Sequence, residues 1–191
     1  MPTLTLLGGP NGAGKSTLAS RLFVGNTEVP FLNADIMARA LRPSDPEAAS
    51  VEAGRRLLRL RDRLIAAGSG MTIETTLASR GHLQALRRAS ASRLSTHLVF
   101  VWITNVEICL ERVAHRVMQG GHHVPTDVVI RRFALGRCYL SDYLAVVDDA
   151  DILDGSITPR PVASKRLGEF VVHDSDRWRI VEASLSAARQ S

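Results

Sequence analysis

An eight-residue stretch near the start of the chain has the residue types and spacing of a phosphate-binding loop. Residues 9–16 read Gly-Pro-Asn-Gly-Ala-Gly-Lys-Ser and match the pattern G-x-x-x-x-G-K-[ST]. The glycines let the backbone curl so that successive N–H groups point at phosphate oxygens, and the following helix adds its positive dipole end. Lys15 can then bridge the β- and γ-phosphates of a nucleotide, and Ser16 can hold Mg²⁺.

The context of this loop favours a nucleotide site over a glycine-rich turn that binds nothing. An apolar segment precedes the loop and a helical pattern follows it, as a phosphate loop requires. Lys15 is one of only two lysines in a chain with 22 arginines, where an ordinary surface position would usually carry arginine. We therefore expect ATP and Mg²⁺ as cofactors, with the metal on Ser16 and a nucleotide site formed by Gly9, Pro10, Asn11, Gly12, Ala13, Gly14, Lys15, Ser16 and Thr17.

Two large classes of phosphate-loop protein are excluded by motifs that the chain lacks. Transporter-type ATPases of the ABC class share the loop wording, but they need a Leu-Ser-Gly-Gly-Gln signature and an apolar strand that ends in Asp-Glu. The apolar run 98–103 ends in Thr104-Asn105 instead. GTPases need an Asn-Lys-x-Asp motif, and neither Lys15 nor Lys165 lies in one. The remaining candidates point to a small kinase.

Acidic residues follow two of the apolar segments. In an open parallel sheet the carboxyl ends of the strands face the ligand crevice, so Asp35 could accept the proton of a substrate hydroxyl that attacks the γ-phosphate. On spacing alone Asp35 could equally cap a helix that starts at Ile36. Glu74 and Thr76 could hold the water shell of Mg²⁺ or a substrate hydroxyl, although an ordinary polar strand end is the simpler interpretation.

Arg112 and Arg116 are four residues apart and therefore share one helix face, at the edge of an apolar stripe. Two guanidinium groups in this place could neutralise charge on a transferring phosphoryl group. The alternative is a pair of arginines whose stems cover apolar surface while their charges pair with nearby acids.

Residues 120–125 have the composition of a flexible turn followed by a rigid stop. The glycine pair Gly120-Gly121 and the later Pro125 form the hinge that a closing lid would need, and Thr126 is expected to cap the next helix. The adjacent pair His122-His123 is not a zinc site, because neighbouring rings rarely chelate one ion and no carboxylate completes the set. The next helical pattern carries Arg131 and Arg132.

The elements that must position these residues alternate between strands and helices, which predicts an α/β P-loop NTPase fold with an open five-stranded parallel sheet flanked by helices. Asp45 is expected to cap the second helix and Gly68 to end it. We expect one domain over 1–191, with a core at 1–156 and a short C-terminal hairpin and helix at 157–191. The expected strands are Leu4–Leu7, Phe31–Asn33, Met71–Thr75, His97–Ile103 and Asp151–Leu153; the expected helices are 15–24, 46–67, 81–92, 105–118 and 126–147; the extension has strands Pro161–Ala163 and Phe170–Val172 and a helix near 176–188.

Composition sets the broad class. The 191 residues are 45% apolar and 23% charged, which is typical of a globular domain. The net charge of +5 favours an anionic ligand, either a phosphorylated small molecule or nucleic acid. Cys109 and Cys138 indicate neither a disulfide framework nor a zinc site. We expect a cytoplasmic protein, because no apolar run is long enough for a membrane helix and the N-terminus lacks the pattern of a signal peptide.

Taken in order, the motifs resemble those of the zeta toxin-like kinases, a branch of the phosphate-loop kinases. The resemblance covers about residues 4–156, and its most specific feature is the order of the whole set. Two positions depart from the family pattern: His122 stands near the place of a lid arginine, and residues 154–156 read Asp-Gly-Ser where Asp-Asn-Ser is expected. The motifs are the loop at 9–17, Asn33-Ala34-Asp35, Glu74-Thr75-Thr76, Arg112-Val113-x-x-Arg116-Val117, Gly120-Gly121-His122-x-Val124-Pro125 and Arg131-Arg132.

The resemblance implies a role for each matching residue. The best-known members of this family phosphorylate the sugar 3′-hydroxyl of UDP-N-acetylglucosamine. By analogy, Lys15 and Ser16 would bind ATP and Mg²⁺, and Asp35 would be the general base. Arg112 and Arg116 would stabilise the transferring phosphoryl group. Contacts to the acceptor would come from Asp35, Glu74, Thr76, His122, Arg131 and Arg132.

The sequence therefore predicts an ATP-dependent kinase that phosphorylates a small-molecule hydroxyl, with a UDP-amino sugar as the acceptor that the family suggests. Another metabolite kinase or a polynucleotide kinase of the same superfamily is the first alternative, since the arginine excess suits nucleic acid. The second alternative is a nucleotide-binding protein that pairs with an antitoxin and transfers no phosphate.

Overall fold

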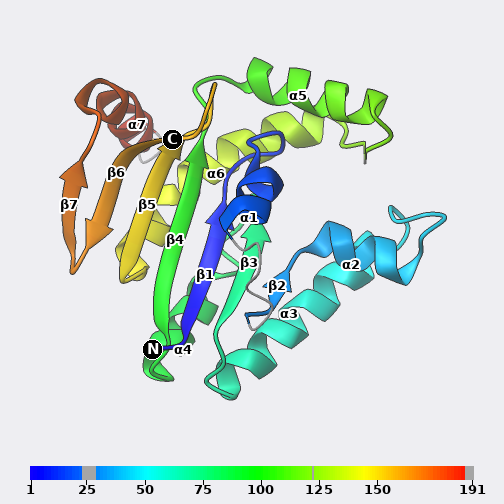
Figure 1. Cartoon of the computed structure of the whole chain (residues 1–191), viewed down its shortest axis with the longest axis horizontal. Coiled ribbons are helices and arrows are strands. Elements are labelled where there is room, and N and C mark those ends of the chain that lie inside the picture. Colours follow the sequence, from blue (N-terminus) through cyan, green and yellow to red (C-terminus); the bar gives the residue numbers. More distant parts are fainter. Residues whose placement is uncertain (23–28, 122, 188–191) are drawn as a thin grey trace.

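A seven-stranded sheet in the order β2-β3-β1-β4-β5-β6-β7 forms the centre of the structure (Figure 1). The structure is a computed structural model that describes residues 1–22, 29–121 and 123–187. Strands β1 to β5 run parallel, and β6 and β7 are added antiparallel. The strands are β1 (Thr3–Gly8), β2 (Phe31–Leu32), β3 (Met71–Thr75), β4 (Ser95–Trp102), β5 (Asp149–Asp154), β6 (Arg160–Arg166) and β7 (Glu169–Val172).

This sheet confirms the predicted α/β class and the five parallel strands. The C-terminal hairpin is less of an appendage than the sequence suggests, because β6 pairs along β5 from Ala150↔Lys165 to Asp154↔Arg160 and so extends the same sheet. β1 lies between β3 and β4. The phosphate loop, which follows β1, therefore emerges at the middle of the parallel part of the sheet.

Alternate residues of β4 point to opposite faces of the sheet, as the pleat requires. Leu98, Phe100 and Trp102 pack on one face against α4, α6 and α7, whereas Val99 and Val101 pack on the other against α1 and α5. Figure 1 shows α1 and α6 on opposite sides of the strands. The helices are α1 (Lys15–Leu22), α2 (Ala34–Leu41), α3 (Ser50–Ala66), α4 (Leu83–Ala91), α5 (Val106–Met118), α6 (Thr126–Val146) and α7 (Ser175–Ala187).

The start of α3 differs from the prediction. The helix begins at Ser50, and Asp45 instead accepts a hydrogen bond from the Ala48 amide at 3.2 Å, in the turns that precede it. The predicted end is confirmed, since Gly68 has φ +63° and follows the last turn. The separate short helix α2 is not among the expected helices, although a helix from Ile36 is part of one of the two interpretations of Asp35.

The glycine pair at the end of α5 stops that helix. Gly120 has φ +79°, and the Gly121 amide donates to the Arg116 carbonyl at 2.9 Å, as in a Schellman motif. A Cβ on Gly121 would lie 2.5 Å from Arg116 Cγ, so this glycine makes room for the Arg116 side chain. The predicted cap of α6 is wrong: Pro125 occupies the N-cap position, Thr126 is the first helical residue, and no side chain caps this end.

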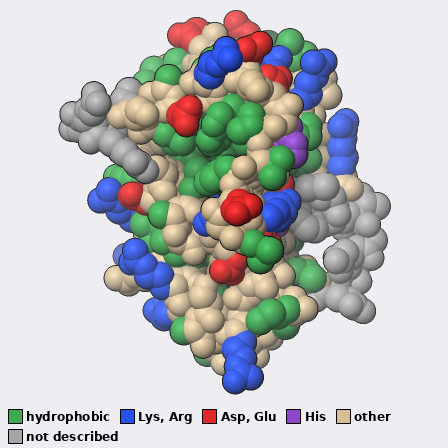
Figure 2. Space-filling view, turned by 90° about the vertical axis from the view of Figure 1, so that its left-hand side faces the viewer, with side chains coloured by type: hydrophobic (Ala, Val, Ile, Leu, Met, Phe, Trp, Pro, Cys, Tyr) green, Lys and Arg blue, Asp and Glu red, His purple; other side chains and the backbone are tan. Residues whose placement is uncertain are grey.

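β7 is the outer strand of the sheet, and its Phe170, Val171 and Val172 are exposed. Figure 2 looks onto this side of the molecule and shows hydrophobic side chains between charged ones. No helix within the described residues has both the length and the apolar character needed to cross a bilayer.

Candidate active site

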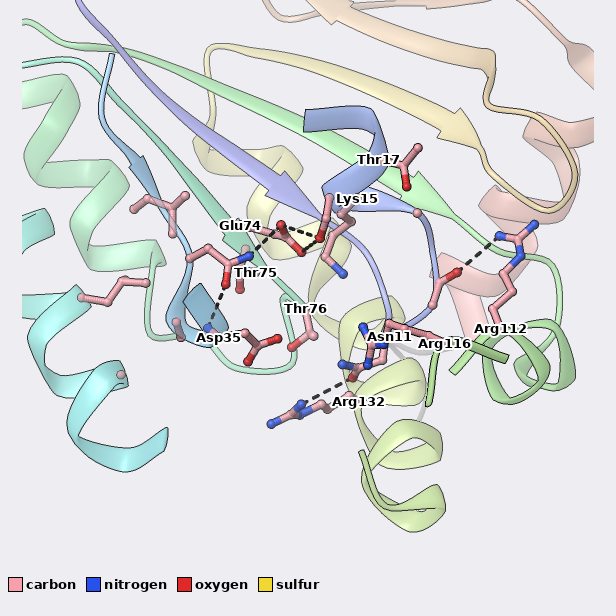
Figure 3. A pocket seen from close by; sticks show the side chains of 18 of the residues that line it. Asn11, Lys15, Thr17, Asp35, Glu74, Thr75, Thr76, Arg112, Arg116 and Arg132 are labelled. Atoms are coloured by element: carbon pink, nitrogen blue, oxygen red, sulfur yellow. Dashed lines mark hydrogen bonds between the residues drawn. The ribbon is translucent and has the colours of Figure 1, made fainter. Parts of the chain in front are cut away.

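A cavity of about 770 Å³ opens beside the carboxyl ends of β1, β2 and β3, where the sequence predicts the ligand crevice. Its walls come from the phosphate loop, the β2–α2 junction, α3, the end of β3 and the helices α5 and α6 (Figure 3). Most of the predicted site residues meet there. They are Asn11, Gly12, Gly14, Lys15, Ser16, Thr17, Asp35, Glu74, Thr76, Arg112, Arg116 and Arg132.

The other predicted positions fall elsewhere. Gly9, Pro10 and Ala13 shape the phosphate loop without lining the cavity. Arg131 is exposed and is not among the residues that line it. His122 lies outside the described residues.

The phosphate loop needs its glycines for two separate reasons. Gly9, Gly12 and Gly14 have φ values of +143°, +76° and +87°, a region that L side chains rarely adopt. At two of them there is also no room for a side chain, because a Cβ on Gly9 would lie 2.6 Å from the Val101 carbonyl oxygen and one on Gly12 2.7 Å from that of Cys109. The loop therefore presents its backbone at close range, as phosphate binding requires.

Lys15 is folded into the loop that precedes it. Its side chain is buried, with 7% exposed, and Nζ donates a hydrogen bond to the Pro10 carbonyl at 2.9 Å. Burial lowers the pKa of Lys15, and the nearby carboxylates of Glu74 and Asp35 partly offset that shift. The loop thus holds a compact positive charge close to both acids of the site.

Ser16 and Glu74 are in direct contact across the cavity, although they are 58 residues apart in the sequence. The Ser16 hydroxyl lies 3.1 Å from each Glu74 carboxylate oxygen, and Asn33 Nδ2 donates to Oε2 at 2.8 Å. A hydroxyl and a carboxylate in this arrangement are hard oxygen donors of the type that Mg²⁺ prefers. The structure therefore brings the predicted metal residue and the β3 acid into one group.

Asn33 also decides between the two interpretations of Asp35. Its Oδ1 accepts hydrogen bonds from the amides of Asp35 at 2.8 Å and Ile36 at 3.0 Å, so Asn33 is the N-cap of α2. The interpretation of Asp35 as the cap is wrong. Asp35 lies in the first turn with an exposed side chain, and Figure 3 shows its carboxylate in the same space as Lys15 and Thr76.

Arg112 binds backbone carbonyls of two loops, and Arg116 and Arg132 line the cavity. Arg112 donates to the carbonyls of Gly155 and Ser156 at 2.8 Å each and to that of Gly12 at 3.3 Å, on the side of the phosphate loop away from Asp35 (Figure 3). Arg116 lines the cavity, and its charge contributes to the lowered pKa of Lys15. The remaining member of the lining set, Arg132, donates to Asn11 Oδ1 at 3.5 Å.

The close packing of the loop after β5 explains why the chain has glycine at position 155. A Cβ on Gly155 would lie 2.5 Å from Val101 Cγ1 and 3.1 Å from the Ala13 carbonyl, so the loop after β5 sits directly on the phosphate loop. An asparagine would not fit this arrangement. Arg112 connects the two loops through its hydrogen bonds to carbonyl oxygens of both.

Comparison with known proteins identifies the family of this chain. The AAA_33 family, described as an AAA domain, matches residues 4–134, a span that contains every predicted site residue. The chain belongs to this AAA domain family. An uncharacterized protein of Haemophilus influenzae is 34% identical to this chain over 125 residues, which cover 65% of this chain and 88% of that protein.

Solved structures share the fold of this chain at low sequence identity. The AvrRxo1-ORF1:-ORF2 complex superposes with a TM-score of 0.73 and 17% identity over 95% of this chain, which spans only 63% of that chain's length. A structure of the PezAT toxin–antitoxin system of Streptococcus pneumoniae gives 0.62 and 16%, covering 100% of this chain and 88% of that one. Deoxyadenosine kinase from M. mycoides with bound dATP gives 0.51 and 10%, covering 81% and 92%. The shared fold is that of P-loop kinases.

One wall of the cavity in this AAA domain was not predicted. Gly54, Leu57 and Leu58 of α3 line it, as does His82, which precedes α4. Their spacing places the three α3 residues on one helix face, but so does that of any amphipathic helix. Gly54 is the signal that could have indicated this wall, because it lies inside a helix, where helix propensity favours almost any other residue.

Proposed function

We propose that this AAA domain is an ATP-dependent kinase that transfers the γ-phosphoryl group to a hydroxyl of a small molecule. The observation that carries the proposal is one cavity that combines the phosphate loop, a hydroxyl–carboxylate pair and a separate exposed carboxylate, Asp35. A second carboxylate beside the phosphate loop is what a general base for a hydroxyl acceptor requires. The neighbouring kinase folds support the same reaction class.

The residues present fit ATP and Mg²⁺. The cradle of Gly9 and Gly12 would be filled by any Cβ, and the buried ammonium of Lys15 lies within it. Within the described residues, no group of three or more His, Cys, Asp and Glu side chains could hold a metal alone. Ser16, with Glu74 beside it, would share the ion with nucleotide phosphates. Bound Mg²⁺ would neutralise charge on the β- and γ-phosphate oxygens.

In this mechanism Asp35 is the general base. The acceptor oxygen forms a bond to the γ-phosphorus, the bond between that phosphorus and the β–γ bridging oxygen breaks, and ADP leaves. The hydroxyl proton passes to the Asp35 carboxylate, which is free to receive it because Asn33 performs the capping of α2. Thr76, at the end of β3, would orient the acceptor.

The arginines of α5 and α6 would act on different parts of the substrates. Arg116 and Arg132 line the cavity and would meet the transferring phosphoryl group. Arg112 donates to three carbonyl oxygens of the two loops, so it would position the nucleotide end and act on the phosphoryl group only through it. Arg131 is exposed, which makes it a weaker candidate for the acceptor contact that the family resemblance implies.

For the acceptor we propose a UDP-amino sugar, on the strength of the zeta toxin-like motifs and the fold shared with the PezAT toxin–antitoxin structure. The same likeness makes an antitoxin protein a candidate partner. A polynucleotide acceptor is the second candidate, favoured by 22 arginines and by the fold shared with an RNA repair complex at a TM-score of 0.55. ATP as phosphate donor suits a cytoplasmic protein.

The test is a ³¹P NMR assay of the full chain with ATP, Mg²⁺ and a panel of UDP-sugars, beside the Asp35→Ala variant. A new phosphomonoester signal on UDP-N-acetylglucosamine that the variant lacks would support the kinase and its acceptor together. Consumption of ATP with no sugar product would remove the UDP-sugar and call for oligonucleotides, whose binding should weaken steeply with salt. Absence of ATP binding by the wild type would overturn the proposal.

A further inference from the structure

One face of α3 borders the cavity and has no part in the phosphoryl transfer described above. Gly54, Leu57, Leu58 and Arg61 are spaced i, i+3, i+4 and i+7, so they follow one another along this face. The first three line the cavity, and Arg61 contacts His82, which lines it as well. Because the phosphate loop occupies the other side, this α3 face borders the part of the cavity left for the acceptor.

Arg61 fixes the hydrogen-bonding state of His82. Arg61 is buried, with 5% exposed, and it is anchored to the Asp62 carboxylate at 2.8 Å and to the Gly81 carbonyl at 3.0 Å. Its Nη1 lies 3.1 Å from His82 Nδ1. A guanidinium group has no lone pair to offer, so Nδ1 must be the acceptor, and the single proton of the neutral ring must be on Nε2.

The ring of His82 stays neutral at physiological pH. Burial and, after it, the charge of Arg61 lower the pKa of His82 to about 4, while Asp62 offsets this only in part. The backbone is held too, since the His82 amide donates to Tyr143 Oη at 3.4 Å and that hydroxyl donates to the Ser79 carbonyl at 2.7 Å. Nε2 makes no hydrogen bond to any residue that the structure describes, which leaves a fixed, uncharged donor on a side chain that lines the cavity.

Gly54 and the two leucines shape the space beside this donor. A Cβ built on Gly54 meets no heavy atom within 4 Å, so neither packing nor backbone conformation requires glycine there. Gly54 therefore leaves the cavity wall without a side chain next to Leu57, which is 5% exposed, and Leu58, which keeps 40% of its surface exposed. The apolar surface of the two leucines beside Gly54 suits a flat or ring-shaped group better than an open, fully hydrated chain.

We propose that the α3 face of Gly54, Leu57 and Leu58, together with His82, recognises the acceptor through an uncharged ring that carries a carbonyl or ring oxygen. The ring lies on the leucines, and the oxygen accepts a hydrogen bond from His82 Nε2. This inference rests on the proposed kinase function, because it concerns the acceptor of the same cavity. Arg61 is a positioning residue that acts through His82.

Two substitutions of His82 separate recognition from structural support. In His82→Asn the side-chain oxygen can still accept from Arg61, but the donor at the Nε2 position is lost; in His82→Gln the amide nitrogen replaces Nε2, but the acceptor for Arg61 is lost. With UDP-N-acetylglucosamine or uridine as acceptor, His82→Asn should raise KM for the acceptor about three- to tenfold and leave KM for ATP unchanged. His82→Gln should stay near the wild type. The reverse order would show a structural role for His82 and overturn the inference.

A binding measurement tests the inference even if no panel compound is phosphorylated. The ring nitrogens of ¹⁵N-histidine-labelled full-length protein would be followed near pH 7, with the His82 signals identified by their loss in His82→Asn. We expect a protonated Nε2 that shifts on addition of uridine or N-acetylglucosamine and not on addition of glycerol. No shift with either ring compound, or an equal shift with glycerol, would overturn the inference. Lack of ATP consumption alongside a selective shift would instead count against the kinase proposal.

Discussion

The phosphate loop draws its binding groups from nine consecutive residues, whereas the acceptor side of the same cavity is assembled from α2, α3, β3 and the segment before α4. On the nucleotide side the groups that matter are backbone amides, positioned by glycines such as Gly9 and Gly12. On the acceptor side they are side chains such as Asp35, in the first turn of α2, and His82, which is held by Arg61, distant in sequence.

This difference has a physical consequence for how each side responds to substitution. A backbone cradle is built once by local geometry, and one side chain, Lys15, adds the charge. A side-chain site depends on many separate contacts, each worth on the order of 1 kcal/mol. We therefore expect substitutions on the nucleotide side to abolish function outright and those on the acceptor side to change specificity and turnover in graded steps.

The largest effect on activity is expected at Lys15. Lys15→Ala should abolish nucleotide affinity or turnover, since it removes the charge inside the loop, while stability changes little because a buried ammonium is lost. The matched control is the other lysine, Lys165, whose Nζ donates to the Leu144 and Val147 carbonyls at 2.8 and 2.7 Å. Lys165→Ala should lower the melting temperature and leave turnover intact. Equal loss of ATP binding in both variants, measured by calorimetry, would contradict this contrast.

The next largest effect is expected at the general base. Asp35→Asn should lower kcat about 10²- to 10⁴-fold, because the amide cannot take up the hydroxyl proton, and KM for ATP should stay nearly constant. Asp45→Asn is a suitable control, since Asp45 caps the turn before α3. Steady-state kinetics of the wild type and both variants would measure kcat and KM for ATP. Unchanged kcat in Asp35→Asn would remove this residue from the base role.

The same division explains what could be predicted from the sequence. The conformation of the phosphate loop could be predicted from the sequence, because it depends on local backbone geometry that a short motif specifies. The five parallel strands followed from apolar runs alternating with helical patterns. The pairing of β6 along β5 did not, since a hairpin's register says nothing about which strand it joins.

The sequence did not predict contacts between distant residues. Arg112 was expected to face the phosphoryl group, and helical spacing gave the correct face, but its partners at Gly155 and Ser156 depend on where the loop after β5 lies. The Arg61–His82 contact joins two residues with no motif between them. Asn33 could have been recognised as a cap, because an asparagine directly precedes the helical pattern.

Acid should destabilise the protein through His82, on the acceptor side of the cavity. His82 has a pKa of about 4 in the folded state against its ordinary 6.5, so the unfolded chain binds this proton first as pH falls. The free energy of unfolding should therefore decrease between pH 6.5 and 4.5, by roughly 2 to 3 kcal/mol from His82 alone. Urea denaturation at the two pH values should show this loss reduced in His82→Gln. Identical losses in variant and wild type would mean that His82 titrates normally.

The smallest effect in free energy gives the sharpest test of the acceptor side, since it compares two helical glycines. A Cβ on Gly136 of α6 would lie 2.8 Å from the Thr76 carbonyl oxygen, whereas one on Gly54 of α3 meets nothing. Gly54→Ala should therefore raise the free energy of unfolding by about 1 kcal/mol, and Gly136→Ala should lower it. If the gap at Gly54 serves the acceptor, Gly54→Leu should raise KM for the acceptor about tenfold or more while KM for ATP stays constant. A stabilised Gly54→Ala together with an unaffected Gly54→Leu would show that the gap is only a weakness of the helix and that the acceptor binds elsewhere.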